Sequence, residues 1–104
     1  SYGQRRLIAL ARALISDPRL ILLDEPSAGL NDAETMQLAE ILRGLGRVVP
    51  MVIVDHKMRL MTDLCDRLVV LDMGRVVAAG RPAEVLSDPK VIRAYMGGAP
   101  DAVG

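Results

Sequence analysis

A short apolar run that ends in two acids constrains this chain more than any other stretch. Residues 20–23 read Leu-Ile-Leu-Leu and are followed at once by Asp24, Glu25 and Pro26. Four consecutive apolar residues indicate a fully buried strand or a piece of buried helix, and the acids and proline stop the run. In a parallel α/β sheet, ligands bind at the carboxyl ends of the strands. Two adjacent carboxylates at that edge suit a magnesium ligand beside a general base.

Helical periodicity surrounds this run on both sides. An amphipathic helix is predicted over residues 5–16, with Leu7, Leu10 and Ile15 on its buried stripe. After the run, Asn31 followed by Glu34 forms a capping-box pattern that predicts the start of a second helix, and glycines at 44 and 46 mark its end.

The second half of the chain repeats the alternation with shorter elements. These are a strand over 51–54, a helix over 57–65 that buries Met58 and Met61, a hairpin of 68–71 with 76–79, and helices that begin at Pro82 and Pro89. The order predicts an α/β fold, a mostly parallel sheet with flanking helices and a C-terminal β-hairpin. Residues 97–104 have little to pack and are expected to form a flexible tail.

Composition excludes several classes of function. The 104 residues carry 13 basic and 13 acidic side chains, so no net charge indicates nucleic acid or a membrane surface as a partner. The single cysteine, Cys65, allows neither a disulfide framework nor a metal site with cysteine spacing, and a reduced, cytoplasmic setting fits it best. No apolar run approaches the ~18 residues of a membrane span. We therefore expect no nucleic-acid partner and no direct membrane insertion.

Two further places combine polar residues with the start or end of an element. Arg5 and Arg6 stand in the first turn of the first predicted helix, where the helix dipole disfavours cations. A bound phosphate would resolve that conflict, and an ordinary N-cap Ser1 with solvated arginines is the alternative. Asp55 and His56 directly follow the second predicted strand, at the same sheet edge as Glu25. His56 taken singly is more often a structural histidine than a catalytic one.

Three stretches together resemble the ATP-binding subunits of ABC transporters. They are Ser-Tyr-Gly-Gln at 1–4, Ala-Leu-Ala-Arg-Ala-Leu at 9–14 and Leu-Leu-Asp-Glu-Pro-Ser-Ala-Gly-Leu-Asn at 22–31. They are similar to the family's signature motif, Walker B strand and D-loop in order and spacing, and His56 stands where the family has its switch histidine. The resemblance covers residues 1–96 and implies the C-terminal part of a P-loop NTPase domain of the ABC type.

The resemblance implies a role for each acid and for the histidine. Asp24 would help to hold Mg²⁺ through a coordinated water, and Glu25 would act as general base on the water that attacks the γ-phosphate of ATP. His56 would contact that phosphate and hold the water and Glu25 in register. The competing interpretation is an acidic strand-to-helix turn with solvated side chains.

The other implied site residues face a second subunit. The signature motif would grip the ATP bound by the opposite subunit, and the D-loop would line the dimer seam and couple the two sites. The signature residues are Ser1, Tyr2, Gly3 and Gln4, and the D-loop residues are Ser27, Ala28, Gly29, Leu30 and Asn31. A second ATP-binding subunit and transmembrane permease subunits are thus the implied partners.

Departures from the commonest pattern indicate a subgroup. Tyr2 replaces a glycine of the signature, Asn31 replaces an aspartate of the D-loop, and residues 88–97 have a characteristic ending. All three resemble the branched-chain amino-acid uptake subgroup. The implied function is ATP hydrolysis that powers import of a small solute, at the cytoplasmic face of the plasma membrane.

The phosphate loop of such ATPases does not occur in these residues. The only lysines are Lys57 and Lys90, and neither follows the required glycine pattern. We therefore expect a fragment that does not hydrolyse ATP alone. Two alternatives stay open, an ABC-type ATPase of DNA repair or translation and a non-catalytic fragment.

Overall fold

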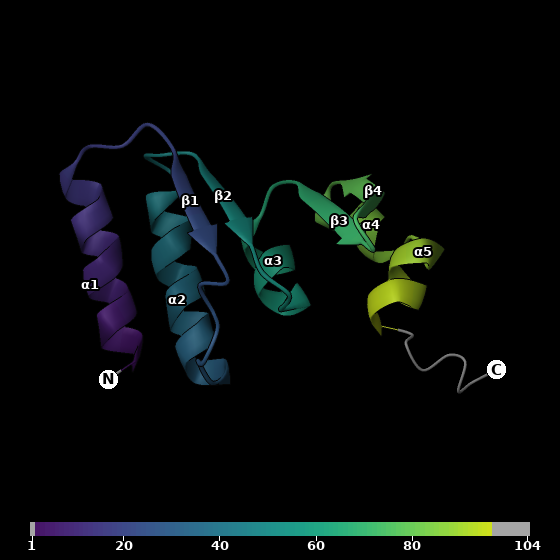
Figure 1. Cartoon of the computed structure of the whole chain (residues 1–104), viewed down its shortest axis with the longest axis horizontal. Coiled ribbons are helices and arrows are strands. Elements are labelled where there is room, and N and C mark those ends of the chain that lie inside the picture. The colour runs from purple at the N-terminus through teal and green to yellow at the C-terminus, as the bar shows by residue number, and fades with distance from the viewer. Residues whose placement is uncertain (1, 97–104) are drawn as a thin grey trace. The chain divides into compact units, whose positions relative to one another are not determined.

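The computed structural model describes residues 2–96, and the side chains of residues 4–95. The chain divides into two compact units, Ser1–Leu64 and Cys65–Gly104. Figure 1 shows the helices and strands of each unit. The predicted tail, residues 97–104, lies outside the described residues.

The first unit alternates helices with two parallel strands. Its elements are α1 (Tyr2–Ile15), β1 (Ile21–Asp24), α2 (Asp32–Leu45), β2 (Met51–Val54) and α3 (Met58–Leu64). The strands pair in parallel, with Ile21 opposite Met51 and Asp24 opposite Val54. Both strands therefore end at the same edge, as the sequence predicts for a parallel pair.

Local sequence signals account for most element ends. The Asn31 side chain accepts a hydrogen bond from the Glu34 backbone, and the Glu34 carboxylate accepts one from Asn31 N–H, which confirms the predicted capping box. Asp17, just before Pro18, has a φ of 53° and follows the end of α1. The start of α1 was predicted three residues too late, because its first turn holds no apolar residue that would reveal the periodicity.

The core of the first unit lies where α1 and α2 meet the strands. Leu10, Leu30, Leu38 and Leu42 form a buried cluster, and Leu23 of β1 and Ile53 of β2 pack against it. Because side chains alternate along a strand, only one face of the pair takes part in this core.

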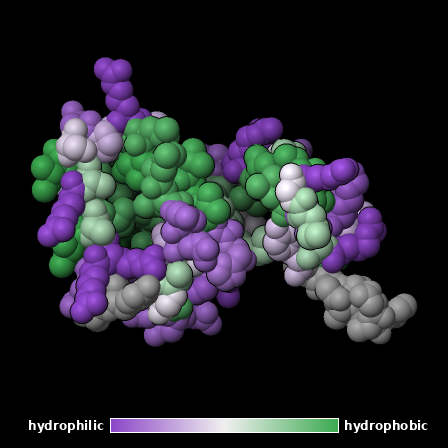
Figure 2. Space-filling model, viewed as in Figure 1, coloured by the Kyte–Doolittle hydropathy of each residue, from purple (hydrophilic) through white to green (hydrophobic). Residues whose placement is uncertain are grey.

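Two expectations about burial were wrong. The run 20–23 is not fully buried, since Leu22 is 69% exposed and Val52 and Val54 of the same face are also exposed. Figure 2 shows hydrophobic side chains gathered on the viewed surface of this region. On α1 the predicted stripe is buried only at Leu10, while Leu7 and Ile15 are exposed, because the packing partners that the described residues supply reach only one turn of this face.

The third helix also buries a different residue from those predicted. Leu60 is buried in α3, whereas Met58 and Met61 are half-buried. A helix of seven residues presents too few turns for periodicity to identify its inner face.

The second unit is built on an antiparallel hairpin. β3 (Leu68–Asp72) pairs with β4 (Arg75–Gly80), with an irregularity between Val70 and Leu71. Met73 and Gly74 at the turn both have positive φ, 52° and 77°, as the commonest two-residue hairpin turn requires. The predicted hairpin is confirmed.

Short helices pack on this hairpin. They are α4 (Pro82–Leu86), α5 (Pro89–Val91) and a π-helical turn over Ile92–Met96. Both prolines stand at the start of their helices as predicted, and Asp88 caps the second one through a hydrogen bond from Lys90 N–H. Leu68, Val70, Val85 and Val91 are buried in this unit, and the Tyr95 hydroxyl donates to the Leu71 carbonyl.

The described helices are all too short or too polar to cross a membrane.

Candidate functional site

The candidate site lies at the edge where β1 and β2 both end. Glu25 continues the ladder by one bond beyond β1, because its N–H donates to the Val54 carbonyl at 2.6 Å. Asp24 and Glu25 follow one strand and His56 closely follows the other. The parallel register thus brings two segments 31 residues apart to one place.

Glu25 holds an uncommon backbone conformation at this edge. Its φ is 49°, in the left-handed region that non-glycine residues adopt at a cost of about 1–2 kcal/mol. The backbone therefore turns sharply just after β1 and leaves the Glu25 carboxylate exposed.

His56 is a titratable neighbour of Glu25. The imidazole Nδ1 lies 3.7 Å from Glu25 Oε1 and 3.8 Å from Asp55 Oδ1. The side chains of His56 and Glu25 are 69% and 56% exposed, so both can reach a molecule in solvent. A protonated imidazole would form an ion pair with either carboxylate at these distances.

Asp55 accepts hydrogen bonds from both segments that follow the strands. Its side chain is fully buried and accepts hydrogen bonds from Ser27 N–H and Oγ and from the backbone N–H groups of His56 and Lys57. Burial raises the pKa of this carboxyl, but the hydrogen bonds from Ser27, Lys57 and His56 outweigh it and lower the pKa below 3.8. Backbone N–H groups and the Ser27 hydroxyl thus stabilise this buried anion.

The loop of residues 27–31, predicted as the D-loop, is anchored at both ends. Ser27 is fully buried against Asp55, and Leu30 is buried in the core of the first unit. Lys57 Nζ donates to the Leu30 carbonyl at 2.9 Å and to Thr35 Oγ1 at 3.0 Å. Gly29 between the anchors has a φ of 80°, which suits a glycine.

Arg6 holds the other side of the same loop. Its guanidinium donates to the carbonyls of Glu25 at 3.0 Å, Pro26 at 2.6 Å and Ala28 at 2.7 Å. Carbonyl oxygens of the chain thus compensate the unfavourable interaction between this cation and the dipole of α1. Arg6 is therefore not simply solvated, because α1 lies beside a loop that turns its carbonyls toward it, and a phosphate at the start of α1 stays a prediction.

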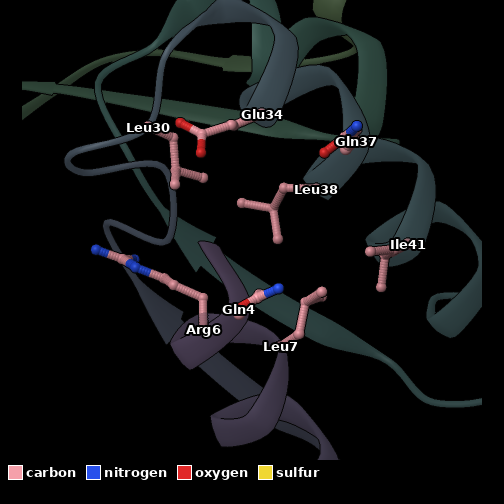
Figure 3. A pocket seen from close by; sticks show the side chains of 8 residues that line it. All are labelled: Gln4, Arg6, Leu7, Leu30, Glu34, Gln37, Leu38 and Ile41. Atoms are coloured by element: carbon pink, nitrogen blue, oxygen red, sulfur yellow. The ribbon is translucent and has the colours of Figure 1, made fainter. Parts of the chain in front are cut away.

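The predicted signature residues lie at the start of α1. The backbones of Tyr2, Gly3 and Gln4 are helical, while Ser1 lies outside the described residues. The exposed Gln4 lines a cavity of about 250 Å³ between α1 and α2 (Figure 3). The labelled side chains come from α1, from α2 and from the loop before it: Gln4, Arg6, Leu7, Leu30, Glu34, Gln37, Leu38 and Ile41.

Asp24 is the residue that could contact a metal ion. It is exposed at the end of β1. Within residues 2–96 no group of three or more histidine, cysteine or acidic side chains is placed to hold a metal. One carboxylate fits Mg²⁺, which keeps several waters and takes further oxygens from a bound phosphate.

The residues that sequence reasoning missed are the ones that fix these loops. Asp55 was noted only as a polar residue after a strand, and neither Lys57 nor Arg6 was assigned a contact with the loop 27–31. The only available signal was position, since Asp55 and Lys57 flank His56. The partners that these three residues have between Glu25 and Leu30 lie 19–28 residues away in sequence, a separation that no local pattern reports.

Comparisons with known proteins find sequences and structures that are similar to this chain. Residues 1–28 match the family described as ABC transporter, and residues 75–101 match branched-chain amino acid ATP-binding cassette transporter. A high-affinity branched-chain amino acid transport ATP-binding protein, LivG of Salmonella typhimurium, is 38% identical over 99 residues, which cover 93% of this chain and 39% of LivG. A lipopolysaccharide export system ATP-binding protein, LptB of Acidithiobacillus ferridurans, is 40% identical over 98 residues, 93% of this chain and 41% of LptB.

Solved structures agree with the sequences. The ADP conformation of an ATP-binding cassette of an ABC transporter superposes with a TM-score of 0.80 at 32% identity, over 93% of this chain and 40% of that one. A structure of cbiO1 from Clostridium perfringens, part of the ABC transporter complex cbiONQ, gives 0.78 at 30% identity over 98% and 41%. The chain spans about two fifths of the length of these relatives, and over that span it is similar in sequence and fold to ATP-binding proteins of ABC transporters.

Proposed function

We propose that the sheet edge where β1 and β2 end supplies the residues that hydrolyse ATP in an ABC transporter ATPase. This ATPase powers import of branched-chain amino acids. The observation that carries the proposal is the meeting of Glu25 and His56, 3.7 Å apart, at the end of two parallel strands. The match of residues 75–101 to the branched-chain amino acid family and the similarity to LivG support this solute class.

Each site residue has a separate task in this proposal. Glu25 accepts a proton from the water that attacks the γ-phosphate of ATP, and its exposed carboxylate can approach a water bound at the edge. His56 keeps that water and the Glu25 carboxylate in position through its Nδ1 atom. Asp24 would help to hold Mg²⁺ through a coordinated water, and the ion when bound would neutralise charge on the phosphates.

The remaining predicted residues act across a dimer seam. Residues 1–4 grip ATP held by a second ATP-binding subunit, and the loop 27–31 lines the seam and couples the two sites. Transmembrane permease subunits are the further partners, with the ATPase peripheral at the cytoplasmic face of the membrane. Residues 1–104 contain no phosphate loop, so we propose that they neither bind MgATP tightly nor hydrolyse it alone.

The test is ATP hydrolysis by the full gene product, meaning the complete translation product of the reading frame that encodes residues 1–104. The Glu25→Gln substitution keeps the size of the side chain and removes the base, so hydrolysis should fall by two orders of magnitude or more, within the usual range for loss of a general base. Nucleotide should remain bound in a dimer, detectable by size-exclusion chromatography.

Glu40 offers a matched control for that substitution. It is an exposed glutamate on α2, and its carboxylate lies 3.7 Å from Arg43 Nη1. Glu40→Gln should hydrolyse ATP at the parental rate. A Glu25→Gln product that turned over ATP as fast as the Glu40→Gln product would exclude Glu25 as the base.

Lipopolysaccharide export is a second candidate, favoured by the 40% identity to LptB. Deletion of the gene separates the two. Loss of leucine uptake by the deletion strain supports import of branched-chain amino acids. Normal leucine uptake together with retention of lipopolysaccharide at the inner membrane supports export instead.

A further inference from the structure

Asp55 joins two loops that the proposed mechanism treats as separate. We propose that Asp55 is a positioning residue, which fixes Ser27 at the start of the loop 27–31 to the backbone of His56, so that a displacement of this loop also displaces the imidazole. This role rests on the proposed function, in which the loop 27–31 lies at a dimer seam and His56 acts on the phosphate. A displacement of the loop 27–31 at the dimer seam would then change the position of His56 in the same chain.

The two carboxylate oxygens divide their partners between the loops. Oδ2 accepts from Ser27 N–H at 3.1 Å and from Ser27 Oγ at 2.7 Å. Oδ1 accepts from the N–H groups of His56 at 2.8 Å and Lys57 at 3.1 Å, and also lies 2.8 Å from Ser27 Oγ. The carboxylate therefore bridges the segments that carry Ser27 and His56.

A second connection runs parallel to the first. Lys57 Nζ donates to the Leu30 carbonyl, near the far end of the loop. The loop is thus bound near both ends to the same three-residue segment, 55–57, and can move with that segment as one body. His56 is the middle residue of the segment.

An ordinary turn before α3 would explain only half of this arrangement. An aspartate often accepts hydrogen bonds from the next two or three backbone N–H groups at a helix start, and the Oδ1 contacts with His56 and Lys57 match that pattern. Such a turn does not require the Oδ2 contacts with Ser27, and it does not require a carboxylate with no exposed surface. The bonds that hydroxyl and amide donors give to a buried anion are strong and directional.

Two substitutions isolate the Ser27 side of the bridge. Ser27→Ala removes the hydroxyl and leaves every acceptor of Asp55 in place. Asp55→Asn can keep Oδ1 for His56 and Lys57 but turns an NH2 group toward Ser27 N–H. Matched controls are Ser16→Ala, which removes an exposed hydroxyl that donates to the Ala13 carbonyl, and Asp63→Asn on the exposed side of α3.

The first measurement is amide hydrogen exchange in the 104-residue chain. Ser27→Ala should speed exchange of the His56 and Lys57 amides about tenfold, although it lies 28 or more residues away and leaves their acceptor intact. Ser16→Ala should leave both amides unchanged. Exchange at the parental rate in Ser27→Ala overturns the proposal, and this arm stands even if Asp55→Asn fails to fold.

The second measurement is the split between kcat and KM for ATP in the full gene product. Ser27→Ala and Asp55→Asn should each lower kcat about tenfold and leave KM within about twofold, since His56 is misplaced but nucleotide binding is not. Parental kcat in both variants overturns the positioning role. A parental gene product without hydrolysis refutes the proposed function instead, while the exchange result still decides whether Asp55 links Ser27 to His56.

Discussion

Removal of the Arg6 guanidinium should loosen the loop that follows β1. The guanidinium donates to three carbonyls, those of Glu25, Pro26 and Ala28, at 2.6–3.0 Å. A hydrogen bond to a charged group contributes about 1.5–3 kcal/mol, but here water can partly replace the donor because the contacts are exposed or half-buried. We expect Arg6→Ala to lower the free energy of unfolding of the first unit by about 2–3 kcal/mol.

Two companion variants separate geometry from charge. Arg6→Lys keeps the charge but offers a single ammonium in place of the planar fork, so it should recover no more than about half of the loss. Arg5→Ala removes an exposed cation from the same first turn, where the helix dipole disfavours it, and should be neutral or stabilising by some tenths of a kcal/mol.

Urea denaturation followed by circular dichroism measures these differences, and hydrogen exchange of the Ala28 and Leu30 amides locates them. Both amides donate to carbonyls within the loop turns, so they should exchange faster when the loop loosens. The reasoning fails if Arg6→Ala is within about 0.5 kcal/mol of Arg5→Ala. It also fails if Arg6→Lys is as stable as the parent, since the fork would then be unnecessary.

Three further predictions concern the same unit. The pKa of Asp55 is lower in the folded state, so its ionised form stabilises the fold at pH above the unfolded value of 3.8, and this stabilisation is lost as pH falls through the folded pKa. Urea midpoints measured at pH 2–6 should show that loss, and Asp55→Asn should flatten the dependence of the midpoint on pH. Glu25→Gly should raise the free energy of unfolding by about 1 kcal/mol relative to Glu25→Ala, because only glycine relieves the positive φ; equal urea midpoints would contradict this. Asn31→Ala should cost about 1 kcal/mol through loss of the capping box, and an unchanged thermal midpoint would refute it.

Local chemistry made most elements of this fold predictable. The capping box at Asn31, the prolines that begin two helices and the Gly74 turn each act through bonds or dihedral limits within a few residues. The prediction that two parallel strands end at one edge followed from their order and from the helix between them. These features need no information about distant residues, so the sequence alone reveals them.

Features set by tertiary contact were not predictable in this way. The run 20–23 was expected to be buried on both faces, but burial depends on what covers each face, and a single apolar string does not say which. The same limit hid Arg6, whose partners lie about 20 residues away. The positive φ of Glu25 accompanies a hydrogen bond from its N–H to the Val54 carbonyl, a partner that is distant in sequence.

At the edge where β1 and β2 end, exposed side chains and the groups that hold the backbone have different roles. Glu25 and His56 have more than half of their side-chain surface exposed, which the proposed function requires for contact with a substrate, and exposed side chains alone are poorly ordered. Their placement must then come from the backbone, which Arg6 and Asp55 hold through bonds to carbonyls and N–H groups rather than to the reactive atoms. A substitution at Arg6 or Asp55 should thus widen the Glu25–His56 distance distribution without a change in either reactive group. For this reason activity lost at these positions should appear in kcat before it appears in nucleotide affinity.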